Sequence, residues 1–343
     1  MVRRVVIVGA GAVGGVLAGY LAKAGHPVVL VEQDPQHRRA IELDGLRFRT
    51  FTSNDVFRLP VVAKPSDVDF ADGDVAIVAV KAFDSAEAYA ALASTAGRSL
   101  PVFSAQNGMG NDAIAADYFD DSNGIVVLFN GTRLLPGEVT QTFPGLNEIG
   151  SYPTGVGASA QALLELFETT LLPVKPTECL EVMRWNKLLL NLSNPISALL
   201  GRPSHEVRGD LAIRAFITEV YGEGRTVLEA AGIRYADDEG AGGFEERLRQ
   251  LTDSGHTPDP PSDASFVGYV SMTQDLMRRS GQTEAHWING EIVRLGAANG
   301  VPTPLNQTLQ ELVEEVARDR AGAGTHTLAE LRAEVDARIA ARV

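Results

Sequence analysis

Cysteine is almost absent from this sequence, in which Cys179 is the only one among 343 residues. An internal disulfide is therefore excluded, and a reducing cytoplasm is the expected compartment. The six histidines show no spacing typical of metal ligands. The sequence therefore predicts a cytoplasmic protein and no metal site.

Basic blocks and long apolar runs are also missing. The chain carries 30 Lys and Arg against 44 Asp and Glu, a formal net charge of −14, which disfavours a nucleic acid or an anionic membrane as a partner. No stretch approaches the roughly 20 apolar residues that a membrane-spanning helix needs. The pair Arg3-Arg4 before an apolar run superficially resembles a signal peptide, but glycines interrupt that run. We therefore expect a folded strand and turn there.

The N-terminus contains an apolar strand that leads into a glycine-rich turn and then an amphipathic helix, over residues 5–23. This order is typical of the first βα unit of a dinucleotide-binding fold. In such a unit the first glycine makes the tight turn, the second lets the backbone approach a pyrophosphate, and the third lets the helix pack on the strand. Free N–H groups at the helix N-terminus favour the phosphates. The predicted cofactor-binding residues of the turn are Gly9, Ala10, Gly11, Ala12, Val13 and Gly14.

Glu32 ends the second predicted strand, 18 residues after Gly14. At about this distance such folds place an acidic residue that accepts hydrogen bonds from the adenosine ribose. A carboxylate there repels a 2′-phosphate, so the cofactor is NAD or NADP, with NAD favoured. Arg38 and Arg39 argue against strict NAD use, but we interpret them as part of a solvated helix face. The alternative for Glu32 is a solvated glutamate at a strand end.

Strands and helices alternate through the first half of the chain, which predicts a mostly parallel sheet. Ligands of such sheets bind at the carboxyl ends of the strands. Lys81 and Asn107 each follow a predicted strand and are expected to face the cofactor crevice. The strand predictions are 27–31, 56–62, 75–80, 100–104, 125–129, 138–142 and 147–149, with helices at 36–44, 85–95 and 158–169.

From about residue 179 the pattern becomes helical. We therefore predict an α/β protein with an N-terminal Rossmann domain at residues 1–178 and an all-α substrate and catalytic domain at residues 179–343. The helices are expected near 184–195, 211–231, 266–279, 283–299, 308–319 and 328–341, with a loop at 237–263 that contains a short helix at 244–251.

Lys187, Asn191 and Asn194 follow a helical spacing that places them on one face, among leucines. Buried polar groups need partners, so this stripe indicates a site rather than a solvated face. Pro195 should bend the helix, because it cannot donate to the carbonyl of Asn191. Glu284 begins a later helix, where it is either a site residue or an acid that complements the helix dipole.

Together these motifs resemble the ketopantoate reductase family. The resemblance rests on the glycine turn and on the motifs at 80–82, 107–110, 185–191, 194–195, 271–275 and 283–290, in the family's order. It implies a Rossmann domain and a helical domain that reduce 2-dehydropantoate to (R)-pantoate with NADPH, a step of pantothenate biosynthesis. It also implies that Lys187 is the catalytic acid with Glu284 as its partner, that Asn107 and Glu284 also contact the cofactor, and that Asn107, Asn191, Asn194 and Ser271 bind substrate.

The chain departs from the family pattern in three places. Glu32-Gln33 stands where the family usually has an arginine suited to NADPH, Asn191 and Asn194 are three residues apart instead of four, and Gly268-Tyr269-Val270 precedes Ser271 without the polar residue often found there. We therefore expect an oxidoreductase that transfers hydride to a small-molecule 2-oxo acid, with a homodimer left open. The alternatives are an NAD-dependent D-2-hydroxyacid dehydrogenase for another branched or aromatic 2-oxo acid, and a nicotinamide-binding regulatory protein without turnover.

Overall fold

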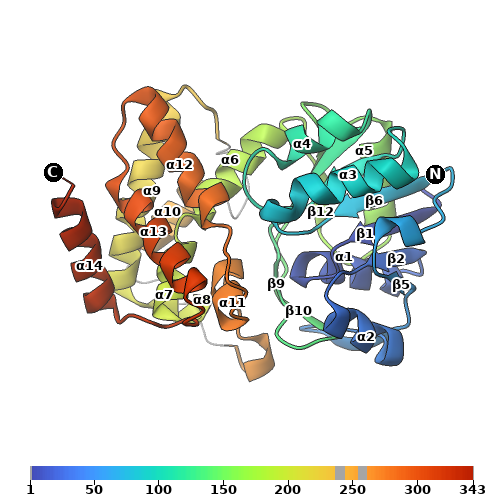
Figure 1. Cartoon of the computed structure of the whole chain (residues 1–343), viewed down its shortest axis with the longest axis horizontal. Helices are drawn as coiled ribbons and strands as arrows, with labels where there is room; N and C mark the ends of the chain where they lie inside the picture. Colours follow the sequence, from blue (N-terminus) through green and yellow to red (C-terminus); the bar gives the residue numbers. More distant parts are fainter. Residues whose placement is uncertain (1, 236–243, 254–260, 343) are drawn as a thin grey trace. The chain divides into compact units, whose positions relative to one another are not determined.

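The computed structural model describes residues 2–235, 244–253 and 261–342 (Figure 1). The chain divides into two compact units. Unit 1 comprises residues 1–106 and 110–183, and unit 2 comprises residues 107–109 and 184–343. Much of the predicted loop at 237–263 lies outside the described residues, but the short helix inside it is present as α10 (Phe244–Thr252).

The central sheet of unit 1 is mostly parallel, as predicted. Its strand order is β12-β11-β8-β7-β6-β1-β2-β5. Every neighbouring pair in it is parallel except β11 with β8. The strands near the glycine turn are almost wholly buried, which fits an apolar layer between helices. The bounds are β1 Arg4–Val8, β2 Val28–Val31, β5 Val61–Val62, β6 Asp74–Val78, β7 Val102–Ser104, β8 Ser122–Val126, β11 Asn147–Ser151 and β12 Val174–Pro176.

A second sheet, of order β4-β3-β10-β9, was not predicted. It consists of β3 (Leu46–Thr50), β4 (Ser53–Phe57), β9 (Asn130–Thr132) and β10 (Glu138–Phe143). The single strand predicted at 56–62 is wrong: its first part belongs to β4 and its last part to β5 of the other sheet. Pro60 lies between the two, and a proline has no N–H to continue a ladder.

Helix α1 (Ala12–Lys23) packs against this second sheet through glycines. A Cβ on Gly15 would lie 2.6 Å from Cγ1 of Val139, and one on Gly19 would overlap the ring of Phe48. Side chains at these positions would push the helix away, so the glycines set the close approach. The other helices of unit 1 are α2 (Pro35–Asp44), α3 (Ser85–Ala96), α4 (Asn111–Tyr118), which was not predicted, and α5 (Ala158–Glu168).

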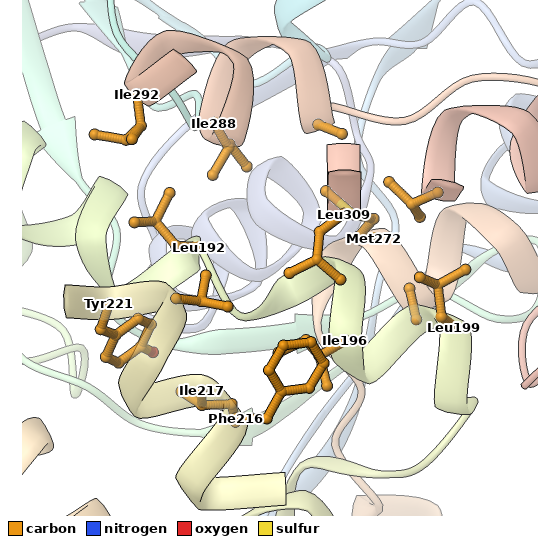
Figure 2. Packing of buried hydrophobic residues seen from close by; sticks show 14 of the residues in the cluster. Leu192, Ile196, Leu199, Phe216, Ile217, Tyr221, Met272, Ile288, Ile292 and Leu309 are labelled. Atoms are coloured by element: carbon orange, nitrogen blue, oxygen red, sulfur yellow. The ribbon is translucent and has the colours of Figure 1, made fainter. Parts of the chain in front are cut away.

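Unit 2 is helical, and its hydrophobic core lies around α9 (Leu211–Ala230). Figure 2 shows Tyr221 of that helix on the side of Leu192 and Phe216 beside Ile196, in the cluster that also contains Leu309. Besides α10, the described helices are α6 (Leu180–Asn191), which begins in unit 1 and continues into unit 2, α7 (Asn194–Leu200), α8 (Ser204–Gly209), α9 (Leu211–Ala230), α11 (Ser271–Met277), α12 (Ala285–Asn299), α13 (Pro304–Arg318) and α14 (Leu328–Ala340). The helix predicted at 266–279 is therefore shorter than expected, since a 3₁₀ turn occupies Ala264–Phe266.

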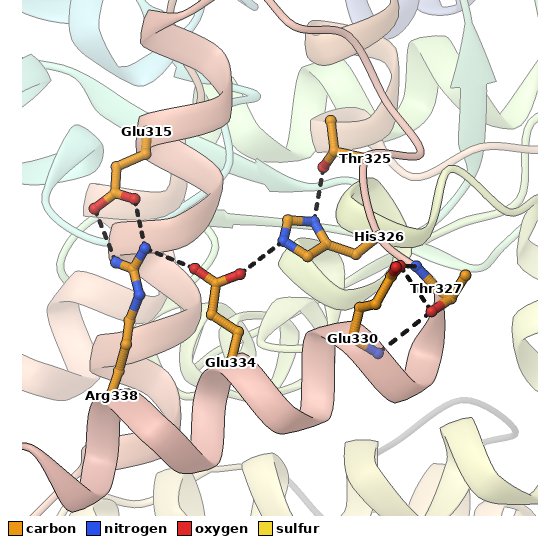
Figure 3. Close-up of polar contacts among 7 residues, drawn as sticks. All are labelled: Glu315, Thr325, His326, Thr327, Glu330, Glu334 and Arg338. Carbon is orange, nitrogen blue, oxygen red and sulfur yellow. Dashed lines mark hydrogen bonds and ion pairs between the residues drawn. The ribbon is translucent and has the colours of Figure 1, made fainter.

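Polar contacts fasten the last helix to its neighbours (Figure 3). Arg338 of α14 donates to both carboxylate oxygens of Glu315 at 2.9 and 2.7 Å, and to Glu334 at 2.8 Å. His326 lies 3.0 Å from Glu334, and Thr327 begins α14 with a capping box. None of the helices in the described ranges combines the length and the apolar character needed to cross a membrane.

Candidate active site

The glycine turn of unit 1 has the local geometry that dinucleotide binding requires. Gly9 has φ +94°, and a Cβ there would lie 3.0 Å from the backbone nitrogen of Val80. A Cβ on Gly14 would overlap the carbonyl oxygen of Gly9, so the start of α1 can approach β1 only with glycine at this position. A Cβ on Gly11, in contrast, meets nothing within 4 Å, so its backbone faces open space. The turn therefore fits a pyrophosphate.

Helix α1 begins at this turn with Ala12 and Val13. Gly11 is its N-cap and has no side chain to satisfy the first amide groups. The first N–H groups of any helix lack acceptors within the helix, and together with the dipole they form an anion site. The carboxylate of Glu32 lies beside the turn, where it accepts hydrogen bonds from the N–H of Ala10 at 2.9 Å and of Asp34 at 2.8 Å.

Two arginines reach the end of β2 around Glu32. Arg38 donates to the carbonyl oxygen of Glu32 at 3.1 Å. Arg133, which follows β9, forms an ion pair of 3.0 Å with Asp34. Arg39 is largely exposed and pairs with Glu42 of its own helix at 3.7 Å, as expected for a solvated face. Sequence reasoning missed Arg133, because only the second sheet, which was itself unpredicted, brings it to this position.

Lys81 lies three residues beyond the end of β6 and is half-buried. It precedes the short 3₁₀ turn Ala82–Asp84. The segment before it contacts the glycine turn, because Ala79 and Val80 are the backbone neighbours of Gly9. Lys81 therefore directly follows a segment that contacts the glycine turn, where the pyrophosphate is expected to bind.

In unit 2 the polar stripe does not continue along one helix. Helix α6 ends at Asn191, and Asn194 begins α7. Pro195 lies in the first turn of α7, where its missing N–H costs nothing, so it starts a new helix instead of bending one. The prediction that Lys187, Asn191 and Asn194 share a single helix face is wrong for this reason. The break is held from α12, where Asn289 donates to the carbonyl oxygen of Leu192 at 3.0 Å.

Lys187 and Glu284 interact electrostatically within unit 2. The pKa of Lys187 is lowered from 10.5 to about 7, chiefly because burial disfavours the ammonium and also because of the nearby charge of Arg184, whereas Glu284 acts to raise it. Glu284 is itself buried and directly precedes α12. It accepts a hydrogen bond from Nδ2 of Asn107 at 3.3 Å. This arrangement combines an amine that titrates near neutral pH with a fixed carboxylate and amide.

The remaining predicted site residues lie at helix ends of unit 2. Asn194 is the first residue of α7 and is buried, whereas Ser271 is the first residue of α11 and is half-buried. Helices α7 and α11 pack against one another. Asn191 is the last residue of α6 and is half-buried. Arg184, whose charge acts on Lys187, was not predicted, although its place one turn before the lysine is a signal that sequence reasoning could have used.

Known proteins match this chain along nearly its whole length. Residues 5–154 match the family model described as ketopantoate reductase PanE/ApbA, and residues 180–317 match the model of its C-terminal part. The chain is 30% identical to the 2-dehydropantoate 2-reductase of Halobacterium salinarum over 326 residues, which cover 92% of this chain and 99% of that protein. It is 28% identical to the enzyme of the same name from Pyrococcus abyssi over 312 residues, which cover 91% and 97%.

Solved structures show the same fold. A PanE/ApbA family ketopantoate reductase from Ralstonia eutropha superposes with a TM-score of 0.75 at 30% identity, covering 93% of this chain and 99% of that one. D-mandelate dehydrogenase, in a ternary structure with NADH and anilino(oxo)acetate, also gives a TM-score of 0.75 with the same coverage, but at 21% identity. The fold and the glycine turn thus define a two-part oxidoreductase with a Rossmann unit. The chain belongs to the ketopantoate reductase family.

Proposed function

We propose that this protein reduces a 2-oxo acid, 2-dehydropantoate, to the corresponding 2-hydroxy acid, (R)-pantoate. The observation that carries the proposal is Lys187, whose pKa of about 7 suits a proton donor at neutral pH. The 2-dehydropantoate 2-reductases that match the chain over nine-tenths of its length support this substrate.

A nicotinamide cofactor would supply the hydride to C2 of the substrate. Negative charge then develops on the carbonyl oxygen, and the ammonium of Lys187 would donate a proton from Nζ to it. Glu284 would keep the ammonium in place and accept a hydrogen bond from the new hydroxyl group. Lys187, left neutral, would regain its proton from solvent.

Four polar residues would hold the substrate. Ser271 and the amides of Asn107, Asn191 and Asn194 can donate hydrogen bonds to a carboxylate without adding a fixed positive charge. Asn107 and Glu284 would also lie beside the nicotinamide. In this proposal residues 1–178 bind the cofactor and contribute Asn107, and residues 179–343 supply the other substrate-binding residues and the proton donor.

The cofactor is proposed to be NADH. Glu32 is held at the end of β2 by the N–H groups of Ala10 and Asp34. A carboxylate fixed there can accept hydrogen bonds from ribose hydroxyls and repels a 2′-phosphate. The pyrophosphate would contact the turn from Gly9 to Gly14 and the neighbourhood of Lys81. The single cysteine favours the cytoplasm as the compartment.

The second candidate is a D-2-hydroxyacid dehydrogenase that acts on another branched or aromatic 2-oxo acid. It is favoured by Glu32 and by the fold shared with D-mandelate dehydrogenase. A regulatory protein without turnover is a weaker candidate, because it has no need of a lysine whose pKa is about 7.

Steady-state rates with a panel of 2-oxo acids test these candidates. The panel contains 2-dehydropantoate, 2-oxoisovalerate and phenylglyoxylate, each with NADH and with NADPH. We expect the highest kcat/KM for 2-dehydropantoate with NADH. A higher value for either other acid would select the dehydrogenase, and cofactor binding without turnover of any acid would select the regulatory protein.

A further inference from the structure

Both polar backbone atoms of Ala10, between the first two glycines of the turn, are held by side chains. Its N–H donates to Oε2 of Glu32 at 2.9 Å, and its carbonyl oxygen lies 2.8 Å from Nε2 of His37 on α2. All three residues are buried, and His37 has no exposed surface. The orientation of this peptide is therefore fixed from two different elements.

The contacts of His37 define its protonation state. The backbone N–H of Gly137 donates to Nδ1 of His37 at 2.8 Å. Because a backbone N–H can only donate, Nδ1 carries no proton, so the proton is on Nε2 and is donated to the carbonyl of Ala10. His37 is thus a neutral bridge between the turn and the residue that precedes β10 in the second sheet.

The direction of the Ala10 carbonyl decides where the next amide points. In a trans peptide the carbonyl and the following N–H point in opposite directions. The carbonyl of Ala10 is turned toward the buried His37, so the N–H of Gly11 is turned away from it. Gly11 is also the residue on which a Cβ would meet nothing within 4 Å.

We propose that His37 is a positioning residue for cofactor binding, which in its neutral form aims the N–H of Gly11 at the pyrophosphate. This inference rests on the proposed function, because it needs a dinucleotide at the turn. His37 therefore helps to hold the amides that bind the phosphates. Its contact with Gly137 gives the second sheet an indirect part in this role.

The same geometry makes binding sensitive to acid. Protonation of His37 would place an N–H opposite the N–H of Gly137 and break that contact. Burial lowers the pKa of His37, the hydrogen bond with Ala10 raises it, the charge of Arg133 lowers it, and Glu32 and Asp34 raise it. These charged groups come from the residue after β9, the end of β2 and the N-cap of α2. Since the net shift is downward, the neutral form persists below pH 6.5 and is lost as pH falls through the lowered pKa.

The test compares His37→Gln with His26→Gln in the full chain. His26 lies beyond the far end of α1 and contacts Thr169 at 2.6 Å, so it controls for the loss of an imidazole in the same unit. Isothermal titration calorimetry with ADP-ribose, whose pyrophosphate stays charged, measures affinity from pH 5 to 8. At pH 7.5 we expect His37→Gln to weaken the binding of ADP-ribose about 10-fold, the size of one lost hydrogen bond, because the glutamine amide cannot contact both Ala10 and Gly137 as the imidazole does.

The pH profile separates positioning from general loss of structure. Wild type and His26→Gln should lose affinity at acid pH in parallel, whereas His37→Gln should show a flatter profile, because both variants keep Glu32 and Asp34. Equal affinity of His37→Gln and wild type at every pH, with normal NADH turnover, overturns the inference and leaves the proposed function standing. Wild type that binds neither NADH nor ADP-ribose overturns the proposed function itself. If His37→Gln fails to fold, ¹⁵N chemical shifts of wild type decide: a protonated Nδ1 at pH 7.5 overturns the inference, and a proton on Nε2 alone supports it.

Discussion

Glu284 accepts a hydrogen bond from Nδ2 of Asn107 at 3.3 Å, although the two residues are 177 positions apart in the chain. Asn107 belongs to the compact unit that also contains Lys187, and Gly108 beside it approaches the backbone of Trp287 on α12. A short segment that follows β7 is thus built into the helical unit, where it contacts the carboxylate that acts on the lysine.

Replacement of Lys187 by Met should lower kcat by about 10²- to 10⁴-fold, the usual range for a positioned general acid. The affinity for NADH should stay within about threefold, because the turn that would bind the cofactor lies in unit 1. The variant should be at least as stable as wild type near neutral pH, since it removes the desolvation cost of a half-buried charge. Lys64→Met, at an exposed position before a 3₁₀ turn, is the control. Normal turnover in Lys187→Met would remove the lysine from the mechanism.

The pKa of Lys187 should also set the pH dependence of kcat. The value is lowered from 10.5 to about 7, so the ammonium is present below pH 7 and is lost as pH rises through it. Reduction needs the ammonium, and kcat should therefore fall about 10-fold per pH unit above 7. Oxidation of the hydroxy acid needs the neutral amine, so its kcat should rise with pH up to about 7. Rates in both directions from pH 5.5 to 9 check this, and parallel profiles would contradict it.

The choice between NADH and NADPH is expected to depend on Glu32. We expect kcat/KM to be at least about 10-fold higher with NADH than with NADPH, because a carboxylate and a 2′-phosphate repel one another. Glu32→Gln should reduce this difference. It should also weaken the binding of both cofactors. The amide group cannot accept hydrogen bonds from the N–H groups of both Ala10 and Asp34, as the carboxylate does. A preference of wild type for NADPH would point instead to Arg38 or Arg133, the cations found at the end of β2.

Short apolar runs between turn signals indicated most of the central sheet, as at Val28–Val31, although β8 begins three residues earlier than predicted and β12 was not predicted. The second sheet was missed. Strand β3 alternates buried and exposed residues, with Leu46 and Phe48 inside and Arg47 outside, but it directly follows the helix α2 and is joined to β4 by a tight turn. Its partner β10 comes about 90 residues later, and such long-range pairing leaves no local signal.

In the candidate site, too, the features set by residues close in sequence could be predicted, whereas contacts between residues far apart in sequence could not. The glycine turn and its geometry follow from residues close in sequence. The break between α6 and α7 was only half predicted, since Pro195 marks it but the hydrogen bond from Asn289 to Leu192 that holds it comes from α12. Arg133 and His37 acquire their contacts only when the second sheet forms. No spacing rule could have indicated them.

Asn194 and Ser271 are expected to recognise the substrate rather than to perform chemistry. They begin α7 and α11, which pack together. Loss of one neutral donor to a charged acceptor removes about 1.5–3 kcal/mol of binding, which is roughly a 10- to 150-fold rise in KM. Ser271→Ala and Asn194→Ala, each measured with the best substrate, check this. A rise in KM for Ser271→Ala alone would keep the carboxylate site but exclude Asn194, and unchanged KM in both would exclude the proposed substrate site.

Gly11 and Gly14 provide a paired test of the turn. Gly11→Ala should leave the melting temperature nearly unchanged, because its new Cβ meets nothing within 4 Å. It should nevertheless lower the affinity for NADH by about 10-fold or more, since the methyl group would lie where the pyrophosphate must approach the backbone. Gly14→Ala should lower both the melting temperature and the affinity for NADH, because its Cβ would overlap the carbonyl oxygen of Gly9 and push α1 away from β1. Thermal unfolding and NADH titration of the two variants separate these effects. If Gly11→Ala binds NADH as wild type does, the pyrophosphate does not lie against this turn, and the cofactor site must be sought elsewhere in the chain.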